Sequence, residues 1–157
     1  MVDFYMMVGL PGTGKSTWTD NYIKNNWNRQ EHFSVISTDD IITDIGSIFG
    51  FTYNQVFDTI TYSFAEKMSY KLARMCFERG DVVVWDQTNL TKKSREKKLK
   101  LIPSHYKKIC VNFSVPSDHK ERLNRPGKII QQSVIDGMAK NYQEPTLDEG
   151  FDEIIRI

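Results

Sequence analysis

The sequence predicts a three-layer α/β/α fold built around a parallel sheet of about five strands. Apolar runs rich in β-branched and aromatic residues alternate with segments of helical periodicity, which is typical of βαβ units. A glycine-rich loop follows the first apolar run directly. Polar residues follow each of the next three runs, and in open parallel sheets ligands bind at the carboxyl ends of the strands.

The expected strands and helices alternate along the chain. Strands are expected at residues 3–8, 33–37, 81–85, 106–113 and, from a weaker pattern, 153–157. Helices are expected at residues 15–26, 39–48, 54–79, 91–101, 117–124 and 131–142. In the longest of these helices, apolar residues from Val56 to Phe77 recur close to helical spacing, which predicts one continuous element that stops at Gly80.

The composition indicates one globular domain spanning residues 1–157, long enough to bury about two thirds of its unfolded surface. Hydrophobic residues make up 39% and charged residues 26%, which is typical of soluble proteins. The apolar runs are too short to cross a bilayer, and the N-terminus lacks the basic flank of a signal peptide, so we expect a cytoplasmic protein without membrane contact. Cys76 and Cys110 show no metal spacing and are expected to be buried free thiols.

The loop GLPGTGKST, residues 9–17, fits the phosphate-loop pattern. Its glycines add no bulk, so backbone N–H groups can turn onto anionic oxygens, and the helix expected to begin at about Lys15 adds the positive end of its dipole. Lys15 would reach the β- and γ-phosphates of ATP, and the Ser16 hydroxyl would bind Mg²⁺. The expected nucleotide-binding residues are Gly12, Thr13, Gly14, Lys15, Ser16 and Thr17.

Two carboxylates, Asp39 and Asp40, follow the second expected strand. An acid at the start of a helix caps exposed N–H groups and suits the helix dipole, and we expect one of the pair to do only that. The other lies at the sheet edge that carries the phosphate loop and could accept a hydroxyl proton from an acceptor that attacks the γ-phosphate. We expect Asp39 to be this general base.

The segment DQTNL, residues 86–90, follows the third expected strand. Hydrophobic burial alone does not explain an acid at the end of an apolar strand, so we interpret Asp86 as a site residue near the magnesium. Gln87, Thr88 and Asn89 offer neutral donors and acceptors that could hold an acceptor phosphate or ribose. A turn is the alternative, because Asp, Thr and Asn all favour turns.

The segment ERLNRPGK, residues 121–128, has the composition of a lid. Arg122 and Arg125 are three residues apart, on one side of a short helix that Pro126 then breaks. Arginines from mobile segments commonly stabilise the charge on a transferred phosphoryl group, so both are candidate catalytic residues. An ordinary solvated helix end is the alternative. The three histidines are scattered, and no role is assigned to them.

Eight lysines or arginines lie between Lys92 and Lys108, against the single acid Glu96, although the net charge of the chain is only +1. A basic stretch on a helix is usually a solvated face. Equally, it could line a groove that holds a nucleic-acid backbone. The sequence leaves both interpretations open.

Several segments together resemble the phosphate-loop kinases related to phage polynucleotide 5′-kinase. They are GLPGTGKSTW, STDD after the second expected strand, VVVWDQTNL at the third, VP followed by an arginine-bearing helix after the fourth, and the closing PTLDEGFDEI. The resemblance covers nearly the whole chain. It implies a phosphate-loop kinase fold with a helical lid, and transfer of the γ-phosphate of ATP, with Mg²⁺, to the 5′-hydroxyl ends of DNA or RNA.

Carried over by position, the resemblance implies that Lys15 and Ser16 bind phosphates and metal and that Asp39 is the general base. Asp86, with Thr88 and Asn89, is expected on the acceptor side, and Arg125 or Arg122 would come from the lid. Three residues after the base, where the phage kinase has an arginine that grips the acceptor phosphate, this chain has Ile42.

Two other functions are compatible with the sequence. DQTNL and GFDEI are also similar to the nucleotide-binding domain of the heterogeneous nuclear ribonucleoprotein U group, which implies an ATP-binding, RNA-associated module without kinase activity. A kinase of a small hydroxyl-bearing substrate, such as a nucleoside or sugar, is the other alternative. An acid at position 39 favours a kinase, because a pure binding module has no chemical reason to keep it.

Overall fold

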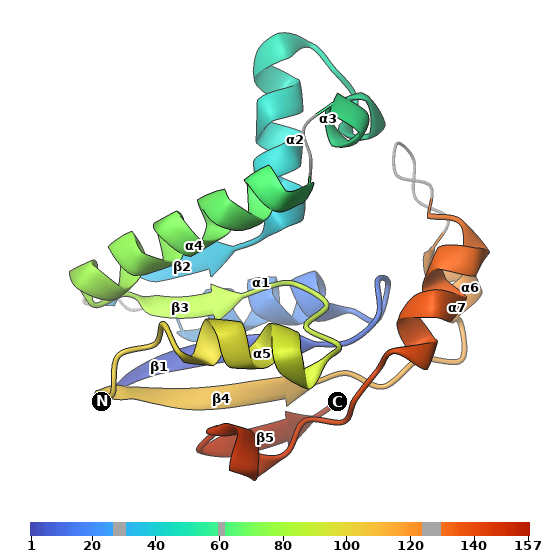
Figure 1. The fold of residues 1–157 in the computed structure, drawn as a ribbon. Coiled ribbons are helices and arrows are strands. Elements are labelled where there is room, and N and C mark those ends of the chain that lie inside the picture. Colours follow the sequence, from blue (N-terminus) through green and yellow to red (C-terminus); the bar gives the residue numbers. More distant parts are fainter. Residues whose placement is uncertain (27–30, 60–61, 124–129) are drawn as a thin grey trace.

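The structure, a computed structural model, describes residues 1–26, 31–59, 62–123 and 130–157 and confirms the predicted fold class. Five parallel strands form one sheet in the order β2-β3-β1-β4-β5 (Figure 1). The strands are β1 (Val2–Val8), β2 (Phe33–Ile36), β3 (Val82–Trp85), β4 (Tyr106–Asn112) and β5 (Glu153–Arg156). Each of them lies within one residue of its expected bounds.

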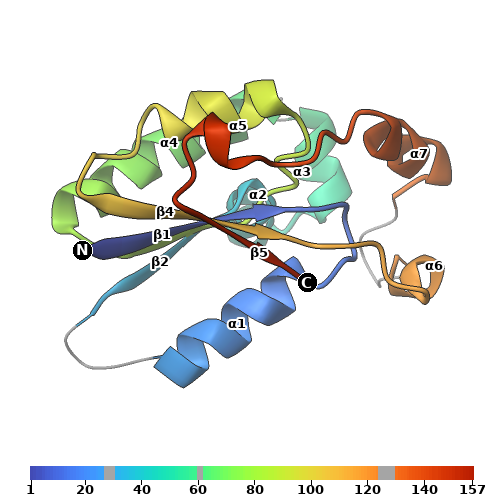
Figure 2. The same ribbon diagram turned by 90° about the horizontal axis from the view of Figure 1, so that it is seen from below.

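Helices cover both faces of the sheet (Figure 2). The helices are α1 (Lys15–Asn26), α2 (Thr38–Phe49), α3 (Tyr53–Thr59), α4 (Tyr62–Arg79), α5 (Lys92–Leu99), α6 (His119–Arg122) and α7 (Gln132–Lys140), with a 3₁₀ turn, η1 (Leu147–Glu149). Along β1, Phe4 and Met6 pack in the cluster on the α4 and α5 side, whereas Tyr5 and Met7 pack in the cluster on the α1 side. Burial on both faces explains why the central strands are continuous apolar runs.

The prediction of one continuous helix over residues 54–79 is wrong. The structure has two helices there, α3 and α4, which run in different directions (Figure 1). Residues 60–61, between the two helices, lie outside the described residues.

Helix α4 packs on the sheet through Ala73, Cys76 and Phe77, which lie in one buried cluster with residues of β1 and β3. Two of the large residues that set the predicted periodicity, Phe64 and Met75, are exposed. The apolar pattern therefore predicted the helix, but part of that pattern lies on its outer face.

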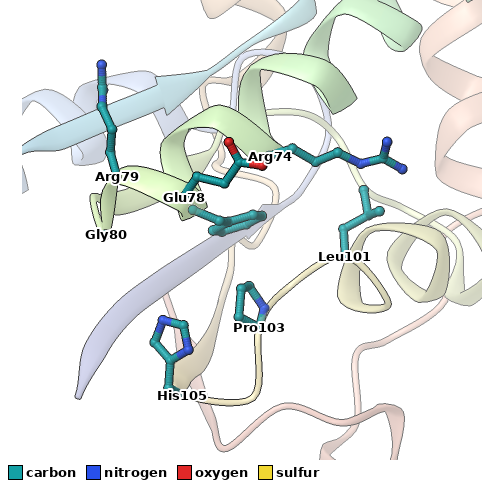
Figure 3. A pocket seen from close by; sticks show the side chains of 8 residues that line it. Arg74, Glu78, Arg79, Gly80, Leu101, Pro103 and His105 are labelled. Carbon is teal, nitrogen blue, oxygen red and sulfur yellow. The ribbon is translucent and has the colours of Figure 1, made fainter.

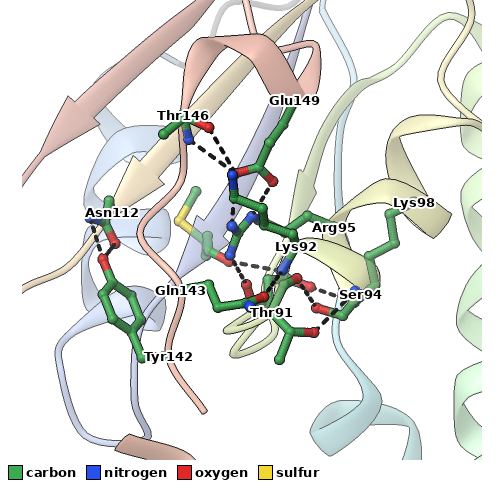
Figure 4. Close-up of polar contacts among 12 residues, drawn as sticks. Thr91, Lys92, Ser94, Arg95, Lys98, Asn112, Tyr142, Gln143, Thr146 and Glu149 are labelled. Carbon is green, nitrogen blue, oxygen red and sulfur yellow. Dashed lines mark hydrogen bonds and ion pairs between the residues drawn. The ribbon is translucent and has the colours of Figure 1, made fainter. Parts of the chain in front are cut away.

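Two of the residues in the basic run are buried structural groups. Arg95 has 0% of its surface exposed, and its guanidinium donates to both carboxylate oxygens of Glu149 at 2.7 and 2.8 Å and to the carbonyl of Asn89 at 3.0 Å (Figure 4). Lys98 is also buried, donates to Asn89 Oδ1, and lies 5.4 Å from the centre of the Trp85 ring. Burial lowers the pKa of Lys98 to about 8.

For Arg95 and Lys98, neither expected interpretation of the basic run holds, because both side chains point into the protein. Arg95 joins the loop after β3 to η1, and Lys98 joins the same loop to α5. Four other lysines of α5 and its end are exposed, namely Lys92, Lys93, Lys97 and Lys100. For these four lysines, a solvated helix face and a surface for a nucleic-acid backbone are both compatible with the structure.

Two further expectations concern the cysteines and the membrane. Cys76 and Cys110 are buried and free, as predicted. In the part of the chain that the structure describes, no helix combines the length and apolar character needed to span a bilayer.

The Arg95–Glu149 pair should make a large contribution to stability. In Glu149→Gln the buried guanidinium loses its counter-charge, and we expect the free energy of unfolding to fall by about 3–5 kcal/mol in urea denaturation. Glu153→Gln is the matched control, because it breaks the 2.7 Å pair of Glu153 with Lys107 on the surface and should leave stability nearly unchanged. Similar losses in the two variants would contradict the structural role of the buried pair.

Candidate phosphate-binding and acceptor site

The phosphate loop connects β1 to α1 and is fixed by its own hydrogen bonds. The N–H of Gly9 donates to the carbonyl of Thr88 at 3.0 Å, and the hydroxyl of Thr13 donates to the carbonyl of Leu10 at 2.8 Å. Gly12 and Gly14 have φ angles of 79° and 98°, which side-chain-bearing residues rarely adopt. The loop therefore leads into the first turn of α1, where unsatisfied N–H groups can bind an anion.

Lys15, the first residue of α1, turns back over the loop. Its side chain is buried, and Nζ donates to the carbonyls of Gly9 at 3.0 Å and Leu10 at 2.7 Å. A positive charge is thus held inside the curve of the loop, where the oxygens of a triphosphate would meet it. Thr17 lies two residues further along α1 and is exposed.

Ser16 and Asp86 join the phosphate loop to the end of β3. The Ser16 hydroxyl donates to Asp86 Oδ2 at 2.7 Å. This contact follows from the sheet order, because β1 and β3 are neighbours and their carboxyl ends meet at one edge. Burial raises the pKa of Asp86, while the hydrogen bond from Ser16 and the charge of Lys15 oppose that rise.

The same pair fits a magnesium ion. Mg²⁺ prefers hard oxygen ligands and is usually held by one or two protein groups together with substrate phosphates. A hydroxyl and a carboxylate side by side, next to the phosphate loop, provide this kind of donor set. Metal binding by Ser16 stays a prediction, and Asp86 is placed to orient the Ser16 hydroxyl.

Asp39 and Asp40 lie in the first turn of α2. The expectation that one of them caps this helix is wrong, because Ser37 is the N-cap and its Oγ accepts from the N–H of Asp40 at 3.2 Å. Asp39 Oδ1 instead accepts from the hydroxyl of Tyr53 at 2.7 Å. Desolvation and the negative charge of Asp86 raise the pKa of Asp40. The ends of β2 and β3 thus bring three carboxylates together beside the phosphate loop.

The predicted acceptor residues in the loop after β3 differ in burial. Asn89 is only 3% exposed, and its amide donates to the carbonyl of Met7 at 2.7 Å while its oxygen accepts from Lys98. These contacts favour a structural role for Asn89, whose φ of 46° also shapes the turn. Asp86 and Thr88 are only partly buried, and acceptor binding stays a prediction for them.

Helix α6, which overlaps the start of the predicted lid at residues 121–122, docks on the phosphate loop through a histidine that the sequence did not single out. His119 is buried, and its Nε2 lies 2.7 Å from the carbonyl oxygen of Pro11. Arg122 pairs with Asp118 at 2.8 Å, and its guanidinium lies near Gly14, 3.8 Å from where a Cβ on that glycine would be. Arg125 lies outside the described residues. The spacing of three between His119 and Arg122 was the available signal, since it puts both on one side of the helix.

A cavity of about 530 Å³ lies away from this site. Its lining includes Gly80, just before β3, and Pro103 and His105, just before β4 (Figure 3). These residues belong to the amino ends of the strands, whereas the phosphate loop follows the carboxyl end of β1. The cavity is therefore not part of the candidate site.

The phosphate loop, the Ser16–Asp86 contact and the sheet order define a phosphate-loop kinase fold. A family model described as an AAA domain matches residues 4–145, and the chain belongs to this family. Heterogeneous nuclear ribonucleoprotein U-like protein 2 of Mus musculus is 25% identical over 95% of this chain, which corresponds to 20% of that protein. The chain thus spans about a fifth of the length of this relative.

Two solved structures show the same fold. A chain of the Pnkp1/Rnl/Hen1 RNA repair complex aligns with a TM-score of 0.69 and 20% identity, covering 89% of this chain and 43% of that one. Chaetomium thermophilum Kti12 in complex with ADP-AlF3 aligns with a TM-score of 0.62 and 16% identity, covering 98% of this chain and 88% of that one. At these identities the likeness is one of fold.

The Ser16–Asp86 contact predicts a magnesium-specific defect. In Asp86→Asn the group that orients Ser16 loses its charge, so we expect ATP to bind about 10- to 100-fold more weakly with Mg²⁺ and nearly unchanged with EDTA, as measured by calorimetry. Asp20→Asn is the control, because Asp20 is an exposed acid on α1 whose charge also acts on Asp86. Equal weakening with and without Mg²⁺ would contradict the assignment.

The His119 contact predicts that α6 helps to form the nucleotide site. His119→Ala removes the hydrogen bond to Pro11, and we expect the Kd for ATP to rise by about 2- to 10-fold. His105→Ala serves as the control, because His105 is exposed beside the remote cavity. An unchanged Kd in the His119 variant would show that α6 docks without contributing to nucleotide binding.

Proposed function

We propose that this chain is an ATP-dependent kinase that phosphorylates the 5′-hydroxyl ends of DNA or RNA. The observation that carries the proposal is the position of Asp39 at the end of β2, on the sheet edge that also carries Lys15 and the Ser16–Asp86 pair. A carboxylate, a phosphate-binding lysine and a pair suited to magnesium on one edge are the groups that phosphoryl transfer to an alcohol requires.

The chain's own residues account for each step. The loop N–H groups and Lys15 hold the triphosphate, and Asp39 takes the proton of the acceptor hydroxyl as its oxygen forms a bond to the γ-phosphorus. The bond from that phosphorus to the β–γ bridging oxygen breaks, and ADP leaves. Arg122 offsets the charge that develops on the transferred group. Ser16, oriented by Asp86, would hold Mg²⁺, which would supply positive charge for the phosphate oxygens.

A nucleic-acid acceptor is supported by two observations. The fold is shared with a chain of an RNA repair complex. The exposed lysines of α5, Lys92, Lys93 and Lys97, offer positive charge for a phosphate backbone. Ile42, at the position where the phage kinase has its acceptor-gripping arginine, is fully buried, so another group must hold the acceptor.

A second function is an ATP-binding, RNA-associated module without transfer activity. The similarity to heterogeneous nuclear ribonucleoprotein U-like protein 2 over 95% of the chain favours it. In such a module Asp39 would have no chemical role, and RNA binding would respond to salt and to ATP.

An acceptor screen with γ-labelled ATP tests these functions together. We expect label transfer to 5′-hydroxyl oligonucleotides, none to 5′-phosphorylated ones, and little to nucleosides or sugars. Lys15→Ala and Asp39→Asn should lower the rate by about 100-fold or more. Asp44→Asn should not, because it removes an exposed charge from the same helix without touching the first turn.

Each other outcome of the screen identifies a different function. Transfer to small acceptors alone would indicate a small-molecule kinase. No transfer to any acceptor, with salt-sensitive RNA binding that survives Asp39→Asn, would indicate the binding module.

A further inference from the structure

Helix α3 presents an aromatic pair next to Asp39. Tyr53 and Phe57 are one turn apart, and their rings are stacked with centroids 5.8 Å apart and an interplanar angle of 18°. The hydroxyl of Tyr53 donates to Asp39 Oδ1 at 2.7 Å. Phe57 remains 44% exposed. A stacked pair therefore leads from the proposed general base to an open aromatic surface.

Packing of α3 does not require Phe57 to be aromatic. The helix docks through Val56, which is buried in a cluster with Ile42 of α2 and Ala65 of α4. Figure 1 shows the result, with α3 held beside α2 toward the end of the molecule at which the strands finish. Phe57 is one position beyond Val56, about 100° around the helix, and so points away from the centre of that cluster.

We propose that the Tyr53–Phe57 pair is the acceptor ledge of this site. The exposed face of Phe57 stacks on the unpaired terminal base of a nucleic-acid acceptor, and the Tyr53 hydroxyl orients Asp39 toward the 5′-hydroxyl of that nucleotide. The inference deepens the proposed kinase function and rests on it. It specifies the substrate class as single-stranded ends or overhangs, because a terminal base in a duplex is already paired and stacked.

Tyr53 and Phe57 have separate tasks on this ledge. Every base has a π-face, so stacking on Phe57 gives affinity without sequence preference. Tyr53 is a positioning residue that acts through Asp39. Burial and the bond to Asp39 raise the pKa of Tyr53, so its hydroxyl stays protonated and continues to donate at neutral pH.

The experiment compares two acceptors that differ only in the terminal base. One is a single-stranded 5′-hydroxyl oligonucleotide, and the other is the same strand with an abasic 5′-terminal nucleotide. With wild-type protein, the KM should be about tenfold higher for the abasic strand. In Phe57→Ala the KM for the normal strand should rise by the same factor, with kcat and the KM for the abasic strand little changed.

Tyr53→Phe keeps the ring and removes only the hydroxyl. We expect kcat to fall about tenfold on both strands while both KM values hold, which a merely structural role would not produce. Phe49→Ala is the matched control, because Phe49 is an exposed aromatic at the far end of α2, and both kinetic constants should be unchanged. Thermal unfolding of each variant shows whether α3 is still docked.

Two results would overturn the ledge while leaving the kinase function in place. In the first, Phe57→Ala transfers phosphate to the normal strand with the wild-type KM. In the second, the KM of Phe57→Ala rises equally for the normal and the abasic strand. Failure of the wild-type protein to label any 5′-hydroxyl strand would instead overturn the proposed function, and the ledge with it.

Discussion

The site depends on one constraint, the adjacency of β1 and β3 in the parallel sheet. That adjacency places the first turn of α1 against the residue that follows β3, and the 2.7 Å contact between Ser16 and Asp86 is its direct consequence. The phosphate loop is tied to the same place a second time, since Gly9 donates to the carbonyl of Thr88. Neither contact could form if another strand lay between β1 and β3.

The loop after β3 is in turn held by groups from far along the chain. Asn89 bonds to β1 through Met7 and to α5 through Lys98, and Arg95 joins the carbonyl of Asn89 to Glu149. Glu149 also accepts from the N–H of Thr146, so one carboxylate closes the η1 turn and neutralises a buried guanidinium. The closing segment of the chain therefore has a physical task, which is to fix the loop that carries Asp86.

The sequence predicted features that depend on local pattern and missed those that depend on distant partners. The strands, the phosphate loop and the ends of most helices follow from residues within a few positions of one another, and they were found. Burial of Arg95 could not be predicted locally, because its partner Glu149 lies 54 residues away.

Three features were predicted wrongly or missed, in α2, in α6 and in the helix expected at residues 54–79, and each depends on geometry that the local sequence does not show. Ser37 and the aspartates that follow it are all good caps, and only the backbone geometry shows that Ser37 takes the position. The docking of His119 requires α6 and the phosphate loop, which are far apart in the sequence, to meet in space. The apolar periodicity of residues 54–79 predicted one helix because it continues through both α3 and α4 and does not show that the two helices differ in direction.

The carboxylates at the carboxyl edge of the sheet cannot be explained by their effect on stability. Asp40 and Asp86 both have a raised pKa, through desolvation and nearby negative charge. A carboxyl group whose pKa is higher in the folded than in the unfolded protein favours folding at low pH, and this contribution is lost as the pH rises through the folded-state pKa. At neutral pH these two groups therefore oppose folding. Hydrophobic packing gives no reason to keep these two carboxylates. Binding of a cation and removal of a proton from an acceptor hydroxyl are both reasons to keep them. The acidic edge, more than the glycine-rich loop, therefore favours an enzyme over a simple nucleotide-binding module.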